Sequence, residues 1–271
     1  MKICRKLFST IFGIAMLAAL AVLANAQVTE QAARELASNT GRSELHSTVD
    51  FKPDQFLGVQ RDEQLEQSLA VAVGGRSGLM FIYKVSPAGY EIRENAVVDH
   101  IWMDFDPVFI VVVNPRDGSV YRIRGFGRVE SLAEFERLIT ALRVQVTSPD
   151  RAESLADFYR QVNPENIERL TPILRLMELK QAAEQQCETS SFEVGETAFE
   201  AWWKRAKHLY AQVPFRQTAT PYGKGYLVEW IVLSSAAKGN CGGAPLRARL
   251  EVDGNGQVGK LTFRPLANGD R

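Results

Sequence analysis

The sequence predicts an α+β protein: an antiparallel β-meander with a covering helix, a helical connector, and a second unit of one helix and an antiparallel sheet. Short apolar runs separated by turns rich in glycine, proline and asparagine predict the meander. Stretches with apolar residues every three or four positions predict the helices. A final group of apolar runs, joined by Asp253-Gly254-Asn255-Gly256, predicts the second sheet.

The first 26 residues have the three parts of a secretory signal peptide. Lys2, Arg5 and Lys6 precede an apolar run over 7–23, and Ala24-Asn25-Ala26 places small residues where a signal peptidase cuts. A membrane anchor is the alternative, because the run approaches the roughly 20 apolar residues that span a bilayer. The polar residues and the glycine that interrupt the run, together with the cleavage site, favour a signal peptide over residues 1–26.

Removal of that peptide has consequences for the partners to be expected. It leaves 245 residues, with 29 basic residues against 32 acidic ones, and thus a net charge of −3. Nucleic-acid binding needs a concentrated basic surface, so we expect no nucleic-acid partner. We expect no stable membrane span after cleavage, and a periplasmic or secreted location in a bacterium. An envelope protein or a small ligand would be the partner.

Two cysteines remain after cleavage, Cys187 and Cys241. In an oxidising compartment two cysteines most often pair, and a disulfide between positions 54 apart would destabilise the unfolded chain by roughly 4 kcal/mol. A thiol nucleophile is the alternative, but it needs a neighbouring base. Asn240-Cys241-Gly242-Gly243 reads as a loop that offers none. The sequence therefore predicts a structural disulfide.

Residues 27–47 are expected to form a mobile N-terminal segment, with a short helical stretch over 28–37 that ends at Asn39-Thr40-Gly41. A β-rich unit with a C-terminal helix is then predicted over 48–147. Its first strands are expected at 69–73 and 79–85, separated by a glycine-rich hairpin turn. The same glycines could cradle a phosphate, but such loops lead into a helix, and the residues that follow are strand-like.

The middle of this unit contains further strand signals. Residues 90–98 alternate polar and apolar, as a strand with one wet face does, and 119–125 form another candidate strand. Residues 108–113 are apolar on both faces, which is typical of a central strand. Ser131 and Glu134 form a capping box at the start of a helix over 131–146, whose apolar stripe would lie on the sheet.

The second unit is predicted over 148–268. Helices are expected at 151–162, from there to about 186 with a start or kink at Pro172, and at 196–213. Strands should follow at 225–234, 245–252 and 257–265. Trp202 and Trp203 share an arc of the third helix with other apolar residues, which favours core packing over glycan binding.

The strongest candidate for chemistry is the stretch from Asp99 to Asp106. His100, Asp104 and Asp106 could form an acid/base group or a metal site. In a strand, however, His100 and Asp104 would lie about 13 Å apart, too far to hold one ion. The alternative is a solvent-facing acidic row that pairs with arginines of a nearby strand.

Arg122, Arg124 and Arg128 form the only local basic cluster with an aromatic residue inside it. They are candidates for binding an acidic ligand or a lipid head group. A charged outer strand face that keeps the sheet soluble is the alternative. No cofactor and no metal are expected, because the sequence lacks the Cys-x-x-Cys, His-Glu-x-x-His and Gly-x-Ser-x-Gly motifs.

These observations predict an exported, non-enzymatic binding or assembly protein whose ligand the sequence does not specify. A hydrolase that uses the Asp99–Asp106 stretch is the alternative. The two differ in a structural requirement. A hydrolase must bring His100 and at least two carboxylates to one point, whereas a binding protein should present an apolar concave patch or an unpaired edge strand.

Overall fold

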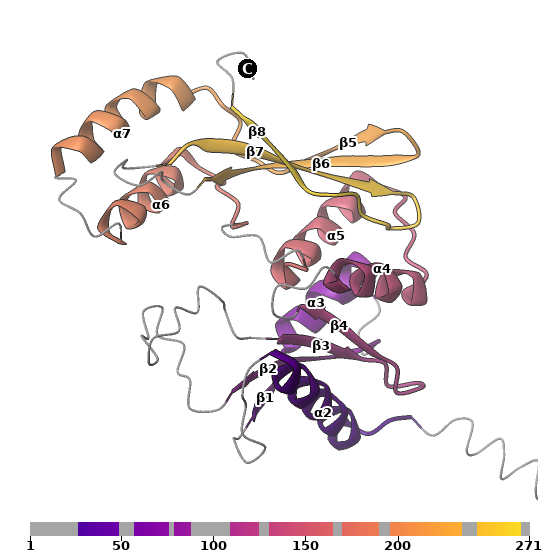
Figure 1. Ribbon diagram of the computed structural model, residues 1–271. Coiled ribbons are helices and arrows are strands. Elements are labelled where there is room, and N and C mark those ends of the chain that lie inside the picture. Colours follow the sequence, from indigo (N-terminus) through magenta and orange to yellow (C-terminus); the bar gives the residue numbers. More distant parts are fainter. Residues whose placement is uncertain are drawn as a thin grey trace, which may run out of the picture. The chain divides into compact units, whose positions relative to one another are not determined.

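The computed structural model describes residues 27–48, 57–75, 79–87, 109–124, 130–164, 170–189, 196–234 and 243–266 (Figure 1). The chain divides into two compact units. The first comprises Met1–Asp62 and Leu79–Tyr121, and the second comprises Glu63–Gly78 and Arg122–Arg271. There are two four-stranded antiparallel sheets, each packed with helices, which confirms the predicted α+β class.

The first sheet has the strand order β1-β2-β3-β4. The strands are β1 (Leu57–Arg61), β2 (Phe81–Pro87), β3 (Phe109–Val113) and β4 (Val120–Arg124). All five residues of β3 are buried, which confirms the predicted central strand. β1 was not predicted, whereas the predicted strand over 90–98 lies outside the described residues.

Helix α2 (Glu30–Thr48) extends beyond the short helical stretch predicted over 28–37. The expected break at Asn39-Thr40-Gly41 is absent from this helix, which packs against β1, β2 and β3. Ala33 and Ala37 are fully buried, and the Thr40 hydroxyl donates to the carbonyl of Leu36 at 2.8 Å. Burial against the sheet outweighs the low helix propensity of this short polar stretch.

The strand predicted at 69–73 is wrong, because these residues end helix α3 (Glu63–Ala72). Leu65 and Leu69 are four residues apart, and both are buried on a helix that packs against α5. Gly74 and Gly75 have φ values of +98° and +86°, and the N–H of Gly75 donates to the carbonyl of Ala70 at 2.7 Å. The glycine pair therefore ends a helix and does not form a hairpin.

Helix α4 (Glu130–Leu142) follows the prediction along its buried stripe but not at its start. Phe135 is fully buried, as predicted. The helix begins one residue before the expected cap, Ser131. The carboxylate of Glu134 accepts from the backbone N–H of Arg122 at 3.3 Å and pairs with Arg137 at 2.7 Å. The Glu134 carboxylate thus bonds β4 and a residue of its own helix. It does not form the predicted capping box with Ser131.

Helix α5 (Pro149–Val162) has clear signals at both ends. The hydroxyl of Ser148 accepts from the N–H of Arg151 at 3.4 Å, Pro149 occupies the first turn, and Asn163 ends the helix in a left-handed conformation. Phe158 and Tyr159 are fully buried. Their rings lie 6.0 Å and 5.4 Å from that of Phe135, so aromatic contacts join α4 to α5.

The second sheet has the order β5-β6-β7-β8. Its strands are β5 (Thr218–Tyr222), β6 (Gly225–Leu233), β7 (Pro245–Asp253) and β8 (Thr262–Pro265), preceded by helices α6 (Leu176–Thr189) and α7 (Glu196–Tyr210). The turn predicted at Asp253-Gly254-Asn255-Gly256 joins β7 to the segment that leads into β8. The Asp253 carboxylate fixes it by accepting from the N–H groups of Asn255 and Gln257.

The two faces of the second sheet have different neighbours. Helix α5 packs against β5, β6 and β7, and its Arg160 lies 5.7 Å from the ring of Trp230. We call the face that carries Trp230 the inner face. Side chains alternate along a strand, so Ile231 and Leu233 belong to the opposite, outer face. There they form an apolar cluster with residues of α6, against which Trp202 of α7 packs, as predicted.

Candidate ligand-binding face of the second sheet

Most of the site residues that the sequence suggested lie outside the part of the chain that the structure describes. His100, Asp104, Asp106, Arg128 and Cys241 lie outside the described residues, and the side chain of Arg124 is likewise not described. Arg122 lies on β4, where its side chain is half-buried. Both original candidate clusters therefore remain predictions.

Two kinds of feature are absent from the described part of the chain. No three His, Cys, Asp or Glu side chains among those residues are grouped so that they could hold a metal ion. No helix there combines the length and the apolar character needed to cross a bilayer.

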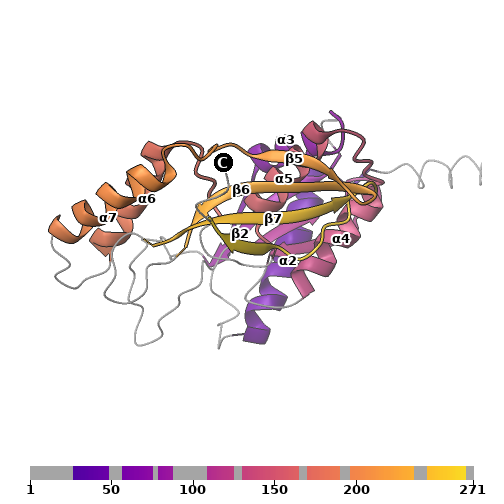
Figure 2. The ribbon, with the colours of Figure 1, turned by 90° about the horizontal axis from the view of Figure 1, so that it is seen from above.

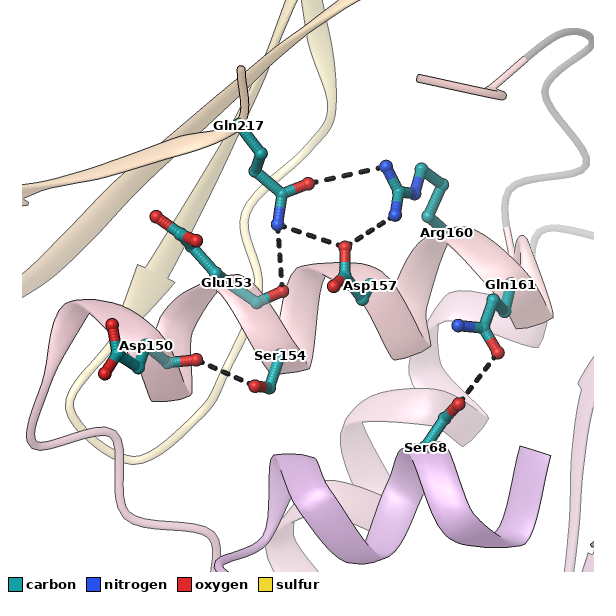
Figure 3. Close-up of polar contacts among 8 residues, drawn as sticks. All are labelled: Ser68, Asp150, Glu153, Ser154, Asp157, Arg160, Gln161 and Gln217. Carbon is teal, nitrogen blue, oxygen red and sulfur yellow. Dashed lines mark hydrogen bonds and ion pairs between the residues drawn. The ribbon is translucent and has the colours of Figure 1, made fainter. Parts of the chain in front are cut away.

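A polar side-chain network joins α5 to the chain that enters β5 (Figure 3). Gln217, just before β5, donates to the Glu153 carbonyl at 3.2 Å and to the Asp157 carboxylate at 3.0 Å, and accepts from Arg160 at 3.4 Å. Arg160 also pairs with Asp157. Burial lowers the pKa of Arg160, and the nearby charge of Asp157 opposes that shift.

This network stabilises the packing of α5 against the start of β5. Arg160 and Asp157 pair with each other, and Gln217 links both to the chain entering β5. The neighbouring contacts are similar, since Ser68 of α3 donates to Gln161 of α5 at 3.0 Å (Figure 3). Satisfied groups of this kind hold elements together and offer a ligand little.

The outer face of the sheet carries a different set of charges. In the register of β7 and β8, Arg247 lies opposite Arg264 and Arg249 lies opposite Thr262. Directly paired residues share a face, so the three arginines lie on one side of the sheet. We call Arg247, Arg249 and Arg264 the arginine row. It continues the face that carries Ile231, the register partner of Arg247.

Three carboxylates share this face with the arginine row. Glu229 pairs with Arg249, with 2.9 Å between Oε1 and Nε. Glu251 and Asp253 follow Arg249 on the same face of β7, and both are exposed. The Asp253 carboxylate is held in the turn after β7, and Arg264 is the exposed cation of the row. Arg247 and Arg264 face each other directly, and like charges at such positions destabilise a sheet.

No described helix lies over the middle of the outer face. Figure 2 looks onto the sheet from the side opposite α5, and α6 and α7 lie at one end of it. Arg264 and its three neighbours in β8 are all exposed. The arginine row therefore lies next to an apolar cluster, with Arg264 exposed and Arg247 and Arg249 half-buried.

No family model, curated protein or solved structure matches this chain.

The arginine row was absent from the predictions made from the sequence. Arg247 and Arg249 lie two positions apart in a predicted strand, which places them on one face. That signal was available. Their alignment with Arg264 depends on the register between β7 and β8, and an irregular connection hides this register.

Proposed function

We propose that this is an exported, non-enzymatic binding protein, periplasmic or secreted, which holds an acidic partner on the outer face of its second sheet. One observation carries the proposal: Arg247 and Arg264 are direct register partners on a face that no described helix covers. A bound anion would place a counter-charge beside the exposed Arg264. The signal peptide supports the exported location.

Arginine suits this role for chemical reasons. Its planar guanidinium donates two parallel hydrogen bonds to a carboxylate or phosphate, and it stays charged at any physiological pH. Side chains on paired strands are held at fixed spacing, which reduces the ordering that binding requires. The expected ligand is therefore a molecule with several acidic groups, such as an acidic stretch of an envelope protein.

The test uses fluorescent polyglutamate and the variants Arg247→Gln and Arg264→Gln, singly and combined. Each lost charge-assisted hydrogen bond contributes about 1.5 kcal/mol or more, so we expect the double variant to bind at least tenfold more weakly. The matched control is Arg116→Gln, which removes an exposed arginine from the first unit and should bind normally. Equal binding by the double variant would refute the proposal.

Assays of turnover test the non-enzymatic part of the proposal. Hydrolysis of an ester, peptide or glycoside by the purified protein, lost in a His100→Ala variant, would instead establish the hydrolase that the Asp99–Asp106 stretch suggested.

We also propose the disulfide between Cys187 and Cys241 in this exported protein. Gln186, next to Cys187, donates to the carbonyl of Ser234 at 3.1 Å. A Cβ placed on Gly243 would lie 2.9 Å from Gln186 Oε1, so the chain two residues beyond Cys241 also reaches this helix. Disulfides need Cα atoms about 4.4–6.8 Å apart. The contacts on both sides support such proximity.

A further inference from the structure

The two edge strands of the second sheet, β5 and β8, differ in how their outward backbone groups are treated. The N–H of Ala219 in β5 donates to the carboxylate of Glu153 on α5 at 3.0 Å. Outward groups alternate along a strand, so the next outward residue is Pro221, which has no N–H. The described β5 edge therefore offers no free donor to another strand.

Among the described residues, the β8 edge differs from β5 in keeping one outward backbone donor. Leu266 donates its N–H to the carbonyl of Pro245 at 3.3 Å, one position beyond the last register pair of β7 and β8, Leu246 with Pro265. In an antiparallel sheet, residues joined in this way point their backbone N–H and carbonyl groups toward the neighbouring strand. By alternation, Arg264 also points its backbone toward β7, whereas Phe263 and Pro265 point theirs away from the sheet. Proline has no N–H, so the outward donor of β8 is the N–H of Phe263.

The side chains of β8 differ between the two faces of the sheet. Arg264 extends the arginine row on the outer face. Phe263 belongs to the inner face, where its side chain is 37% exposed. A strand placed beside β8 at the usual spacing of about 4.8 Å would meet a cation on one face and an aromatic ring on the other.

We propose that an extended segment of a partner protein adds to the β8 edge as a fifth strand, with acidic and apolar residues at alternate positions. Its carboxylates would pair with Arg264 and the arginine row, an apolar side chain would cover Phe263, and its backbone would bond the Phe263 N–H and carbonyl. Strand addition of this kind gains affinity from the backbone and specificity from the alternate side chains. This inference rests on the proposed function, because it names the partner of the same face.

The charges argue against a second copy of this chain as the occupant. Pairing β8 with β8 of another copy would extend the arginine row by a second row of like charge, which Coulomb repulsion disfavours. An acidic strand would instead be attracted to the arginine row. The proposal therefore commits to a partner of complementary charge.

The test uses a labelled ten-residue peptide of alternating Glu and Val, and a second peptide with the same sequence but N-methylated valines. Backbone methylation leaves the charges and removes the ladder donors, so we expect its affinity to be at least about tenfold lower. In the protein, Phe263→Pro removes one outward N–H and should cause a loss of similar size. Phe263→Leu keeps that N–H and is the control, with an expected loss of less than about threefold.

Hydrogen exchange in the wild-type protein gives a readout that does not depend on variants. Addition of the unmodified peptide should slow exchange of the Phe263 amide, because that N–H becomes hydrogen-bonded. The amide of Lys224, in the exposed turn before β6, should exchange at the same rate as before.

The outcomes separate this inference from the proposed function. If both peptides bind equally, through Arg247 and Arg264, and Phe263 gains no protection, strand addition is wrong while the anion-binding face stands. If neither peptide nor polyglutamate binds, both proposals fail. Protection of Phe263 that rises with protein concentration, without peptide, would show a second copy at the edge and would overturn the inference.

Discussion

Gly256 is the residue at which backbone conformation and packing act together. Its φ is +77°, and a Cβ there would lie 2.8 Å from Val144 Cγ1 and 3.0 Å from Ile139 Cγ2. Gly223, in the β5–β6 turn, has φ +57° but no atom within 4 Å of its Cβ position. Gly256→Ala should therefore lower the free energy of unfolding by about 2–4 kcal/mol, and Gly223→Ala by about 1 kcal/mol. Urea unfolding measures both, and equal costs would show that the contact with Val144 is unimportant.

The Asp117 carboxylate makes the stability of the fold depend on pH. It accepts from the backbone N–H of Ser119 at 2.9 Å, and this bond, assisted by the Ser119 hydroxyl, lowers its pKa below the ordinary 3.8. A lowered carboxylate pKa stabilises the fold above pH 3.8, and this contribution is lost as the pH falls through the folded value.

The measurement is an NMR titration of the Asp117 side chain in the wild type and in Ser119→Ala. We expect a pKa below 3.8 in the wild type, and a rise part of the way toward 3.8 in the variant, which keeps the backbone donor. An unchanged value in Ser119→Ala would mean that the hydroxyl plays no part.

Helix α5 shows at the scale of an element how one residue type has opposite effects at two positions. Ser148 caps the first turn, whereas Ser154 donates its hydroxyl to the Asp150 carbonyl one turn back (Figure 3). Ser148→Ala should destabilise the protein by about 1 kcal/mol, because a capping acceptor is lost. Ser154→Ala should be neutral or slightly stabilising, since alanine favours the helix interior. Thermal or urea unfolding compares them, and a larger loss for Ser154→Ala would contradict this account.

The elements that the sequence predicted well are those with a complete local signal. β3 is a short, wholly apolar run, and α5 has a serine cap, an early proline and a closing asparagine. α3 was missed because the apolar run at 69–73 hides a helical period that begins earlier, at Leu65. The sequence of β5 shows little alternation of apolar and polar residues. It forms a strand because it pairs with β6 and because the Ala219 N–H bonds Glu153.

At the scale of the whole molecule, the predicted class was confirmed but the candidate site came from pairing that no local pattern encodes. Arg247 and Arg264 become partners only when β8 aligns with β7, and a one-residue slip would move Arg264 to the inner face. The outward backbone donor of β8 likewise depends on that register. Local patterns fix which residues can share a strand face, and the tertiary pairing decides which charges meet across strands.

The proposed disulfide is the property of the whole chain that is most directly measurable. A bridge between Cys187 and Cys241 closes a loop of 54 positions, for which chain entropy gives about 4 kcal/mol of stability. Reductant should therefore lower the Tm of the wild type by roughly 10 °C, at about 2–4 °C per kcal/mol for a chain of this size. The double variant Cys187→Ser/Cys241→Ser is the control: it should match the reduced wild type and ignore reductant. A wild-type Tm that reductant does not change would mean that the two sulfurs are not joined, and that α6 is held to the end of β6 by non-covalent contacts such as the Gln186–Ser234 hydrogen bond and the apolar cluster.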